Sequence, residues 1–367
     1  DYDGRLDLYG LQAQAVRTAM EGGDALIVRV TERDPALPIP LKVRLLEGDY
    51  LDHTKNGPME NGYAVQGVQF NNEHKRVGYW LHRTHPGDVL AGFSASKLTP
   101  AEDVIHLYEM LRPGQVRGVP RGTAALMRMK SLDDYQDARI EAAKSAACLV
   151  GVVIEPEGDV DKPGSVLPEK LEPGMFPRLK TGEDVRFNNP PSVTGHGEFV
   201  SVEQHAIAIS YGVPFEALTG DLSQVNYSSA RMGFMEFGRN VEQYRWSTLI
   251  PILCQGLAGW FNDTAVLAGK LSGPVRWEWS PPRREMIDTS REVPPMVDLV
   301  RAGGSTLSEW IRTMGFEPDD VFSELAEERK RLDGDGLILT TDAGKVSNAG
   351  VTNARGPGQQ FPEPGND

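Results

Sequence analysis

The hydrophobic positions in the first third of the chain change from a helical period to a strand-like pattern. Apolar residues between positions 10 and 22, among them Leu11, Ala15 and Ala19, recur on one helical face and stop at Gly22-Gly23, which predicts a helix. Short apolar runs separated by turn-forming residues then predict a β-rich region. The predicted strands are 25–30, 41–46, 63–70, 77–83 and 103–109, with turns at Asn56-Gly57, Asn61-Gly62 and Asn71-Asn72.

The middle of the chain predicts two helices on either side of an irregular insertion. Residues 121–150 have a helical pattern with many alanines, and small side chains let a neighbouring helix approach closely. In residues 151–198 proline and glycine recur, and acidic residues outnumber basic ones by nine to five. This stretch is too long for a simple connection, so it predicts a loop-and-strand insertion. Residues 199–211 predict a second, shorter helix that ends at Gly212.

The last third of the chain has a mainly helical pattern. Residues 226–262 follow a loop and predict a helix of 37 residues, which at ~1.5 Å per residue is about 55 Å long. Pro251 lies inside this helix and is expected to kink it, because its ring clashes with the preceding turn. The elements predicted after it are a strand at 275–279, helices at 287–302 and 305–331 with a break near Gly315, and a mobile tail from Asp333.

Composition narrows the class of protein without indicating a chemistry. The chain has 367 residues, 40% hydrophobic and 25% charged, which is enough for two or three domains with a sizeable core. It begins at Asp1 without a methionine or a signal-peptide pattern, which predicts a processed or trimmed part of a longer protein. No apolar run reaches the ~18 residues that a membrane span needs. The net charge of −14 argues against a reader of DNA sequence, but it does not exclude a protein past which DNA slides without sticking.

Histidines and cysteines are the first candidates for a metal site, and their spacing does not favour one. The histidines considered are His82 and His85, with His74 or His106. They match no standard zinc template, so surface or strand histidines are the favoured interpretation. Cys148 and Cys254 lie among apolar residues and are interpreted as buried thiols of a reducing compartment.

Three aspartates could act as paired carboxylates, namely Asp133, Asp134 and Asp137. A solvated first turn of a helix is the favoured interpretation of this group. The chain contains no nucleophile elbow, zinc-protease motif, phosphate loop or dinucleotide fingerprint. We therefore expect no catalytic residue, no metal site and no cofactor, and a DNA-processing enzyme is the least favoured class.

The segment 112–120 (RPGQVRGVP) is a rigid proline- and glycine-rich turn that runs directly into the alanine-rich helix. Arg112, Arg117 and Arg121 are candidates for phosphate contacts or for salt bridges to an adjacent subunit. The second role is favoured because exposed arginine suits interfaces. A rigid basic turn followed by a small-residue helix predicts an assembly component rather than an enzyme.

Several motifs, taken in order, resemble the lambda-type portal family of tailed phages. They are Gly67-Val68, 74–81 (HKRVGYWL), 103–106 (DVIH), 112–120, 132–138 (LDDYQDA), 173–183 (PGMFPRLKTGE), 211–216 (YGVPFE), 218–221 (LTGD) and 226–231 (NYSSAR). The resemblance covers roughly residues 1–330 and is carried by the order of the motifs rather than by any single one. Family members usually carry a further N-terminal segment, which this sequence does not show.

The resemblance implies an α+β portal fold with a mixed α/β wing, a helical stem, a small α/β clip, a long kinked helix and a helical crown-side end. The segment 112–120 then becomes the hinge between wing and stem. The implied parts are a wing at 1–120, a stem helix at 121–150, a clip at 151–198, a second stem helix at 199–212, a tunnel loop at 213–227, the long helix with a wing strand at 226–280, crown-side helices at 281–331 and a flexible tail at 332–367.

The resemblance also implies a ring, typically of twelve subunits, around a channel for double-stranded DNA at one capsid vertex. The implied partners are further copies of the chain, the DNA, the large terminase, the head-tail adaptor and the major capsid protein, with no membrane. The implied location is the virion, and the host cytoplasm during assembly. The alternative interpretation is another phage head-tail connector or a minor capsid assembly protein. The implied site residues are Gln224, Asn226 and Tyr227 in the tunnel loop, Arg112, Arg117, Arg121, Ala142 and Ala146 at the subunit interface, and Glu169, Glu172, Arg178 and Lys180 in the clip.

Overall fold

The computed structural model of the chain falls into two compact units, Asp1–Trp277 and Glu278–Asp367. The structure describes residues 1–30, 37–88, 95–148, 152–154, 184–186, 195–223, 225–282, 286 and 288–339. Six predicted features therefore lie outside the described residues: Gln224, the clip residues Glu169, Glu172, Arg178 and Lys180, and the tail from residue 340. The side chains of Ala146 and Tyr227 also lie outside them.

The first unit is built on helix α1 (Leu8–Gly22) and a three-stranded antiparallel sheet in the order β2-β1-β8. The observed α1 confirms the helix predicted from its apolar period. The Asp7 side chain accepts a hydrogen bond from the Gly10 amide at 2.7 Å and so caps the first turn. The strands are β1 (Ala25–Val30), β2 (Lys42–Glu47) and β8 (Val104–Leu107), which confirms three of the predicted strands.

Strand β1 is central because its two faces belong to two different hydrophobic clusters. Ala25 and Ile27 pack in one cluster with residues of α1 and of the long helix, among them Leu257. Leu26 packs in the other cluster, with residues of the second sheet such as Val68. Successive side chains of a strand point to opposite faces. A single strand therefore joins both clusters into one body.

The second sheet is an antiparallel meander of five consecutive strands, β3-β4-β5-β6-β7. They are β3 (Gly57–Met59), β4 (Gly62–Val65), β5 (Val68–Phe70), β6 (Arg76–Leu81) and β7 (Lys97–Pro100). The single strand predicted at 63–70 is wrong, because Gln66 and Gly67 form a two-residue turn that pairs Val65 with Val68. Their φ angles of 49° and 87° are both positive, as a tight hairpin turn requires.

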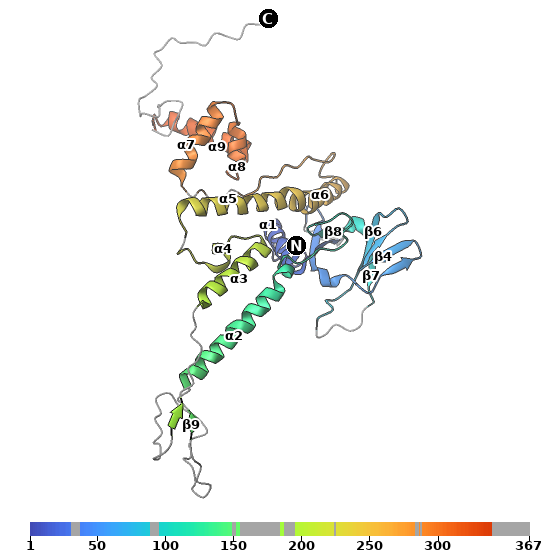
Figure 1. Ribbon diagram of the computed structural model, residues 1–367. Coiled ribbons are helices and arrows are strands. Elements are labelled where there is room, and N and C mark those ends of the chain that lie inside the picture. Colours follow the sequence, from blue (N-terminus) through green and yellow to red (C-terminus); the bar gives the residue numbers. More distant parts are fainter. Residues whose placement is uncertain are drawn as a thin grey trace. The chain divides into compact units, whose positions relative to one another are not determined.

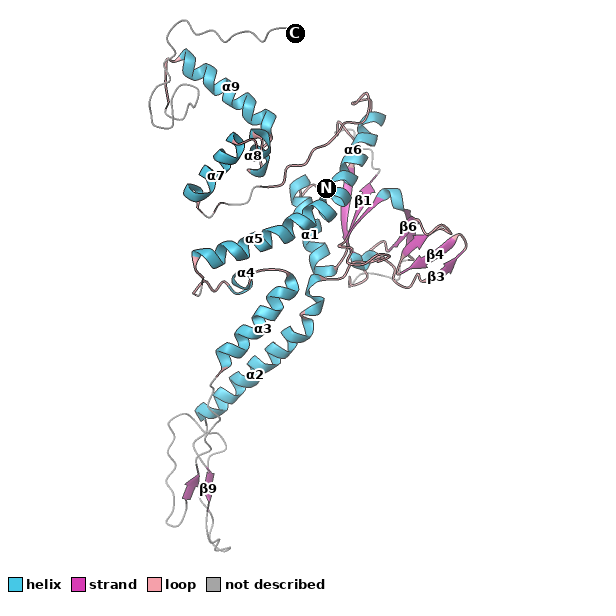
Figure 2. Ribbon diagram, turned by 45° about the horizontal axis from the view of Figure 1, so that its top comes forward, coloured by secondary structure: helices cyan, strands magenta, loops and turns pink. Residues whose placement is uncertain are grey.

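Two antiparallel helices lie side by side in both views of the chain (Figures 1 and 2). They are α2 (Leu126–Cys148) and α3 (His196–Tyr211), and they confirm the two helices predicted on either side of the insertion. The chain enters α2 through a 3₁₀ turn at Arg121–Ala124. Within the predicted insertion the structure describes a short antiparallel strand pair, β9 (Val152–Ile154) with β10 (Asp184–Arg186), and the first turn of α3.

The long helix predicted at 226–262 is present, but its middle is not α-helical. Its parts are α5 (Tyr227–Tyr244), a π-helical segment (Arg245–Cys254) and α6 (Gln255–Leu267). Pro251 lies in the π-helical segment, where the Gln255 amide bonds the Ile250 carbonyl five residues earlier. Proline lacks a donor, and a π-helical segment is where helices take up such an irregularity. The disruption expected at Pro251 therefore takes the form of a wider helical turn.

The strand predicted at 275–279 is wrong, because these residues have no strand partner among the described residues, and Val275 and Trp277 bond a side chain instead. The Val275 carbonyl accepts from Asn262 Nδ2 at 2.9 Å, and the backbone amide of Val275 donates to Asn262 Oδ1 at 3.3 Å. The Trp277 indole donates to the same oxygen at 3.2 Å. An asparagine of α6 thus replaces the neighbouring strand that an apolar run of this kind usually requires.

The described part of the second unit contains three helices, where the sequence predicted two with a break in the second near Gly315, and this break is observed. They are α7 (Thr289–Arg301), α8 (Leu307–Thr313) and α9 (Pro318–Gly334). Each is followed by a glycine with positive φ, at Gly303, Gly315 and Gly336, and each of these glycines ends its helix in a left-handed turn. Among the described residues of this unit only Pro318 is buried, so the unit has almost no core of its own.

The close approach of α6 to β8 gives a stability prediction. A Cβ at Gly256 would lie 2.7 Å from Ile105 Cδ1, whereas a Cβ at Gly259 would meet nothing within 4 Å. We expect Gly259→Ala to stabilise the protein by up to about 1 kcal/mol through helix propensity. Gly256→Ala should instead overpack the core, so its free energy of unfolding should be about 1–3 kcal/mol lower than that of Gly259→Ala. Urea unfolding of both variants checks this, and equal free energies of unfolding would contradict it.

Candidate functional site

The candidate functional site is the junction between β8 and α2, and the side chain of Gln115 holds its turn together. Its Oε1 accepts hydrogen bonds from the Leu111 and Arg112 amides at 2.8 and 3.3 Å. Its Nε2 donates to the Glu109 and Arg117 carbonyls at 3.3 and 2.8 Å. One buried side-chain amide thereby satisfies four backbone groups that have no sheet or helix partner, so the turn has a defined shape.

A buried carboxylate, Asp24, joins this turn to the start of β1. Asp24 is 1% exposed, and its Oδ1 accepts from His106 Nε2 at 3.0 Å and from the Gly118 amide at 2.5 Å. Its Oδ2 accepts from Arg117 Nε. A buried charge is tolerated only when it is paired and hydrogen-bonded. Here the donors come from residues 82 to 94 positions away in the sequence, so the contact fixes the junction against the body.

Arg117 and Gly118 bring the turn into direct contact with the rest of the body. Arg117 also donates to the Gly48 carbonyl at 3.0 Å and to the Gln66 carbonyl at 3.5 Å, so it contacts three separate stretches of chain. Gly118 has no room for a side chain, since a Cβ there would lie 1.9 Å from the Gly23 carbonyl oxygen. The backbone of the junction therefore packs directly on the backbone that precedes β1.

The charge states in this network follow from its hydrogen bonds. His106 Nδ1 lies 3.4 Å from Arg76 Nη1, and because a guanidinium only donates, the neutral ring carries its proton on Nε2. Burial lowers the pKa of His106 more than Asp24 raises it, and Arg76 and Arg117 lower it further. Burial also raises the pKa of Asp24, but the bonds and charges of His106, Arg117 and Gly118 outweigh this and hold it below its ordinary value. The pair is therefore a carboxylate with a neutral imidazole.

The far end of the junction rests on the ends of α3 and α5. Arg121 Nε and Nη2 donate to Glu109 at 3.2 and 3.0 Å, and the guanidinium lies over the Tyr244 ring, 5.5 Å from its centroid. A Cβ at Gly122 would lie 2.3 Å from the Tyr211 hydroxyl, so the last residue of α3 packs against backbone there. The junction is thus held between the β-rich body on one side and two helix ends on the other.

The three arginines predicted to contact a neighbouring subunit differ in how their own chain engages them. Arg117 and Arg121 bond carboxylates of the same chain, whereas the exposed Arg112 guanidinium has no partner in the part of the chain that the structure describes. Their interface role stays a prediction. The sequence pattern missed Asp24 as the partner of Arg117, although an acid placed directly before a buried apolar strand is a signal for such a pairing.

Helix α2 is largely exposed along its described length. None of the described side chains between positions 126 and 144 is buried, and Ala142 is exposed. It packs on α3 along one side, where Arg128 bonds Glu203 at 2.8 Å and the Tyr135 ring packs on Phe199 and His196 with centroids 4.6 and 5.6 Å away. A helix of this length with so little of its surface covered depends on further packing for most of its stability.

The predicted tunnel loop begins with a tight reversal at the end of α3. Gly212 has a φ of 70°, its amide bonds the Ile209 carbonyl, and the next amide, of Val213, bonds the Ala208 carbonyl, each at 3.0 Å. This pair of bonds satisfies the last carbonyls of the helix and turns the chain back.

The loop itself is partly helical and rests on α3. A short helix, α4 (Phe215–Thr219), occupies its first half, and the Phe215 ring stacks on His205 with centroids 3.9 Å apart. Of the three residues predicted to face a channel, Asn226 is described, and its carbonyl accepts from the Ala230 amide at 2.9 Å in the first turn of α5. The channel-facing role of all three stays a prediction.

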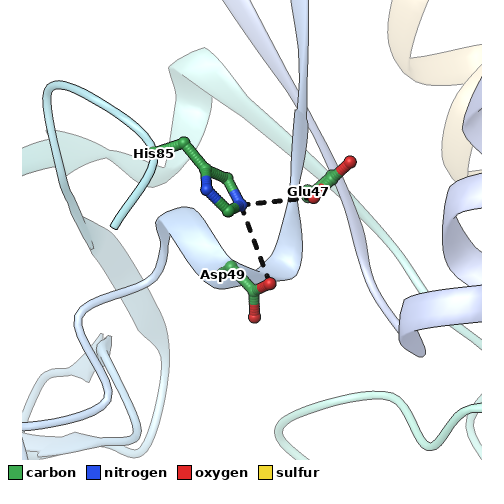
Figure 3. A group of neighbouring side chains, drawn as sticks. All are labelled: Glu47, Asp49 and His85. Atoms are coloured by element: carbon green, nitrogen blue, oxygen red, sulfur yellow. Dashed lines mark ion pairs between the residues drawn. The ribbon is translucent and has the colours of Figure 1, made fainter. Parts of the chain in front are cut away.

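Glu47, Asp49 and His85 are the group in the described part of the chain whose candidate ligand atoms lie within 4.8 Å of one another (Figure 3). His85 Nε2 lies 3.3 Å from Glu47 and 3.7 Å from Asp49. Nδ1 of the same ring accepts from the Gly87 amide at 3.0 Å, so the proton of the neutral ring stays on Nε2, where an ion would bind. Metal-binding histidines instead donate from the other nitrogen. The geometry therefore favours a surface charge cluster over a metal site.

The remaining residues considered for chemistry have separate surroundings. The histidines have different partners: His74 bonds Tyr63, His82 lies 3.9 Å from Asp52, and His106 bonds Asp24. Asp133, Asp134 and Asp137 are exposed, which agrees with a solvated helix face. Their predicted place in a first turn is wrong, because α2 begins at Leu126 and they lie in its middle. Cys254 is buried, and burial raises its pKa to about 11, so this thiol is a packing group.

Among the helices that the structure describes, none combines the length and the apolar character of a membrane span.

Comparisons with known proteins agree on one family. A family model described as "Phage portal protein, lambda family" matches residues 1–245. The probable portal protein of Halomonas phage phiHAP-1 is 27% identical over 350 residues, 88% of this chain and 66% of the relative. Portal protein B of Escherichia phage lambda is 22% identical over 320 residues, 74% of this chain and 59% of the relative. The chain thus spans about two thirds or less of the length of these relatives.

A solved structure shares the fold. It is the neck of an empty GTA particle computed with C6 symmetry, which matches with a TM-score of 0.51 and 18% identity, over 86% of this chain and 80% of that one. The mixed α+β class predicted from the sequence is confirmed by this likeness.

The buried Asp24–His106 pair predicts how stability depends on pH. The pKa of His106 is lower in the folded chain than its ordinary value of 6.5, so below about pH 6.5 the unfolded chain binds the proton more readily. The free energy of unfolding therefore decreases as the pH is lowered. The lowered pKa of Asp24 acts in the same direction at lower pH. His106→Gln keeps an amide donor but does not titrate. Urea unfolding should therefore give a flatter stability curve for this variant between about pH 5 and 7. Parallel curves would contradict a neutral buried imidazole.

Proposed function

Because the chain belongs to the lambda family of phage portal proteins, we propose that copies of it form a ring at one capsid vertex and enclose the channel for double-stranded DNA. We propose twelve subunits, packaging and ejection of the genome through the same channel, and a place in the virion that is reached by assembly in the host cytoplasm. The chain takes part as a structural component without catalysis of its own, and the large terminase supplies the ATP hydrolysis.

The observation that carries the proposal is the exposure of α2. A helix of 23 residues without a buried side chain between positions 126 and 144 buries too little apolar surface to be stable on its own. Its exposed alanines, such as Ala142, let a neighbouring helix approach closely. Copies of the same helix pair arranged around an axis would cover these surfaces, because cyclic symmetry presents the same two faces at every contact.

The charge of the chain supports a conduit rather than a DNA-binding surface. With a net charge of −14, the chain lacks the surplus of Lys and Arg that would neutralise phosphates and hold DNA tightly. An acidic wall repels the phosphates and prevents trapping. In this proposal Gln224, Asn226 and Tyr227 face the channel at the tunnel loop.

The parts of the proposed subunit follow the order of the chain. Residues 1–120 form the wing, α2 and α3 the stem, the stretch around β9 and β10 the clip, and α7 to α9 the crown side. In this proposal the clip docks the large terminase and later the head-tail adaptor through Glu169, Glu172, Arg178 and Lys180, and the major capsid protein surrounds the ring. The support for these partners is the family alone.

The experiment that tests the ring is a mass measurement by light scattering, followed by electron microscopy in top view. A closed ring with a central hole is the expected result. A stable monomer at all concentrations contradicts the proposal. A ring without a stem would favour another head-tail connector instead.

The exposed face of α2 gives a prediction for assembly. Ala142→Leu should leave the melting temperature of the monomer unchanged, because Ala142 is exposed there. In the ring it should overpack the stem and weaken assembly by about 1–3 kcal/mol per contact. The matched control is Ala142→Ser, which stays small and should assemble as the wild type does. Sedimentation velocity over a dilution series measures both variants, and equal assembly would count against packing through this face.

A further inference from the structure

A cleft of about 540 Å³ opens beside the junction, between the segment that leads into α2, the end of α3 and the second half of α5. Apolar side chains at its edge are strongly exposed, with Leu111 at 68%, Ile209 at 78% and Val119 at 47%. Exposed aliphatic side chains that line a concave surface mark a contact site more often than a free surface. The rim therefore indicates an apolar partner.

Two residues that line the same cleft, Tyr244 and Arg121, each have a donor without an acceptor among the described residues. The Tyr244 hydroxyl is buried in a residue only 8% exposed, and no described residue hydrogen-bonds it. Burial and then Glu109 raise the pKa of Tyr244 to about 12, so its hydroxyl stays protonated and can donate. Arg121 uses Nε and Nη2 on Glu109, and its Nη1 has no acceptor among the described residues. A buried donor without an acceptor costs about 1–3 kcal/mol, so the Tyr244 hydroxyl points to an incoming acceptor. The Arg121 side chain is 28% exposed, so its free Nη1 is accessible to the same acceptor.

The complementary chemistry lies on the first half of α5. Met232 and Met235 are 72% and 46% exposed, and the Glu236 side chain is 67% exposed. Residues spaced i, i+3 and i+4 share one helical face, so two apolar side chains and one carboxylate stand together. Glu236 bonds Arg239 at 3.0 Å on the open surface, and such a surface pair contributes little and is easily exchanged.

We infer that the cleft receives the Met232–Met235–Glu236 face of α5 from a second copy of this chain. The methionines pack on Leu111, Val119 and Ile209, and the Glu236 carboxylate accepts from Tyr244 and Arg121. This inference rests on the proposed ring and names a second contact between neighbouring copies, in addition to the packing of α2. Carboxylate oxygens only accept and the two groups in the cleft donate, so the hydrogen-bonding roles match.

The contact has to form between copies. Met235 and Tyr244 belong to the same helix, nine residues and roughly 13 Å apart along its axis, so α5 cannot place its own methionines in its own cleft. A contact between two different patches of the same chain is heterologous, and it closes into a ring when the rotation between copies allows. One cleft and one helix face per subunit are sufficient for such a ring.

The first test compares variants with charged substitutions at exposed positions. All of these variants should fold, because the substituted side chains lie outside the core. Ile209→Arg in the cleft and Met235→Arg on the helix face should each raise the concentration for half-assembly by at least about tenfold. Leu267→Arg is the control, since Leu267 is 88% exposed and belongs to neither patch. Light scattering measures assembly, and circular dichroism checks folding. If the wild type and all three variants assemble equally, the contact is wrong while the ring stands. If the wild type stays monomeric, both fail.

Tyr244→Phe separates a contact role from a packing role. Removal of an unsatisfied buried hydroxyl should leave the monomer as stable as before or more stable. The same change should weaken assembly several-fold if the hydroxyl donates across the contact. A variant with lower monomer stability and unchanged assembly would overturn the role given to this residue.

Disulfide trapping tests the pairing itself. Ile209→Cys and Met235→Cys are prepared separately in a Cys148→Ser background, mixed under assembly conditions and oxidised. A heterologous contact predicts covalent dimers in the mixture and none in either variant alone. Dimers within a single variant, or none in the mixture, would overturn the proposed pairing.

Discussion

The structure of the first unit depends on one buried carboxylate, Asp24, and on the donors that it collects. Burial of a charge is strongly unfavourable unless hydrogen bonds replace the lost water. His106, Arg117 and the Gly118 amide supply them from distant parts of the chain. Because all three bonds have to form together, the position of the junction relative to β1 is fixed. The entry of the chain into α2 follows from that position, and so does the direction in which the helix pair leaves the body.

The molecule divides into a part that completes its own core and parts that do not. β1 joins two hydrophobic clusters, and these make the β-rich body self-sufficient. Helix α2, the first half of α5 and the three helices of the second unit instead leave apolar side chains exposed. In a portal-family protein this division is expected if each subunit folds first and assembles afterwards. The body would give stability, and the uncovered helices would give surfaces for neighbouring copies.

Much of the fold could be predicted from local patterns, and the failures have physical reasons. The apolar period of α1 predicted a helix because α1 is buried along one face, and the apolar run at β1 predicted a strand because the first half of β1 is buried on both faces. The split at Gln66 was missed because a non-glycine residue adopts positive φ there. Arg117 was assigned to an interface because its partner Asp24 is 93 positions away, and local pattern carries no information about such pairs. The cleft beside Tyr244 was missed for the same reason, as three distant segments form it.

The attachment of the helical excursion at both of its ends has a mechanical consequence. The chain leaves the body at Gly118, packed on Gly23, and returns to it where Leu253 and Leu257 join the same cluster as β1. A force applied to the distal end of α2 and α3 is therefore divided between two covalent paths, and both lead into one core. Such an excursion resists being pulled out of its body far better than an arm that is anchored at one end.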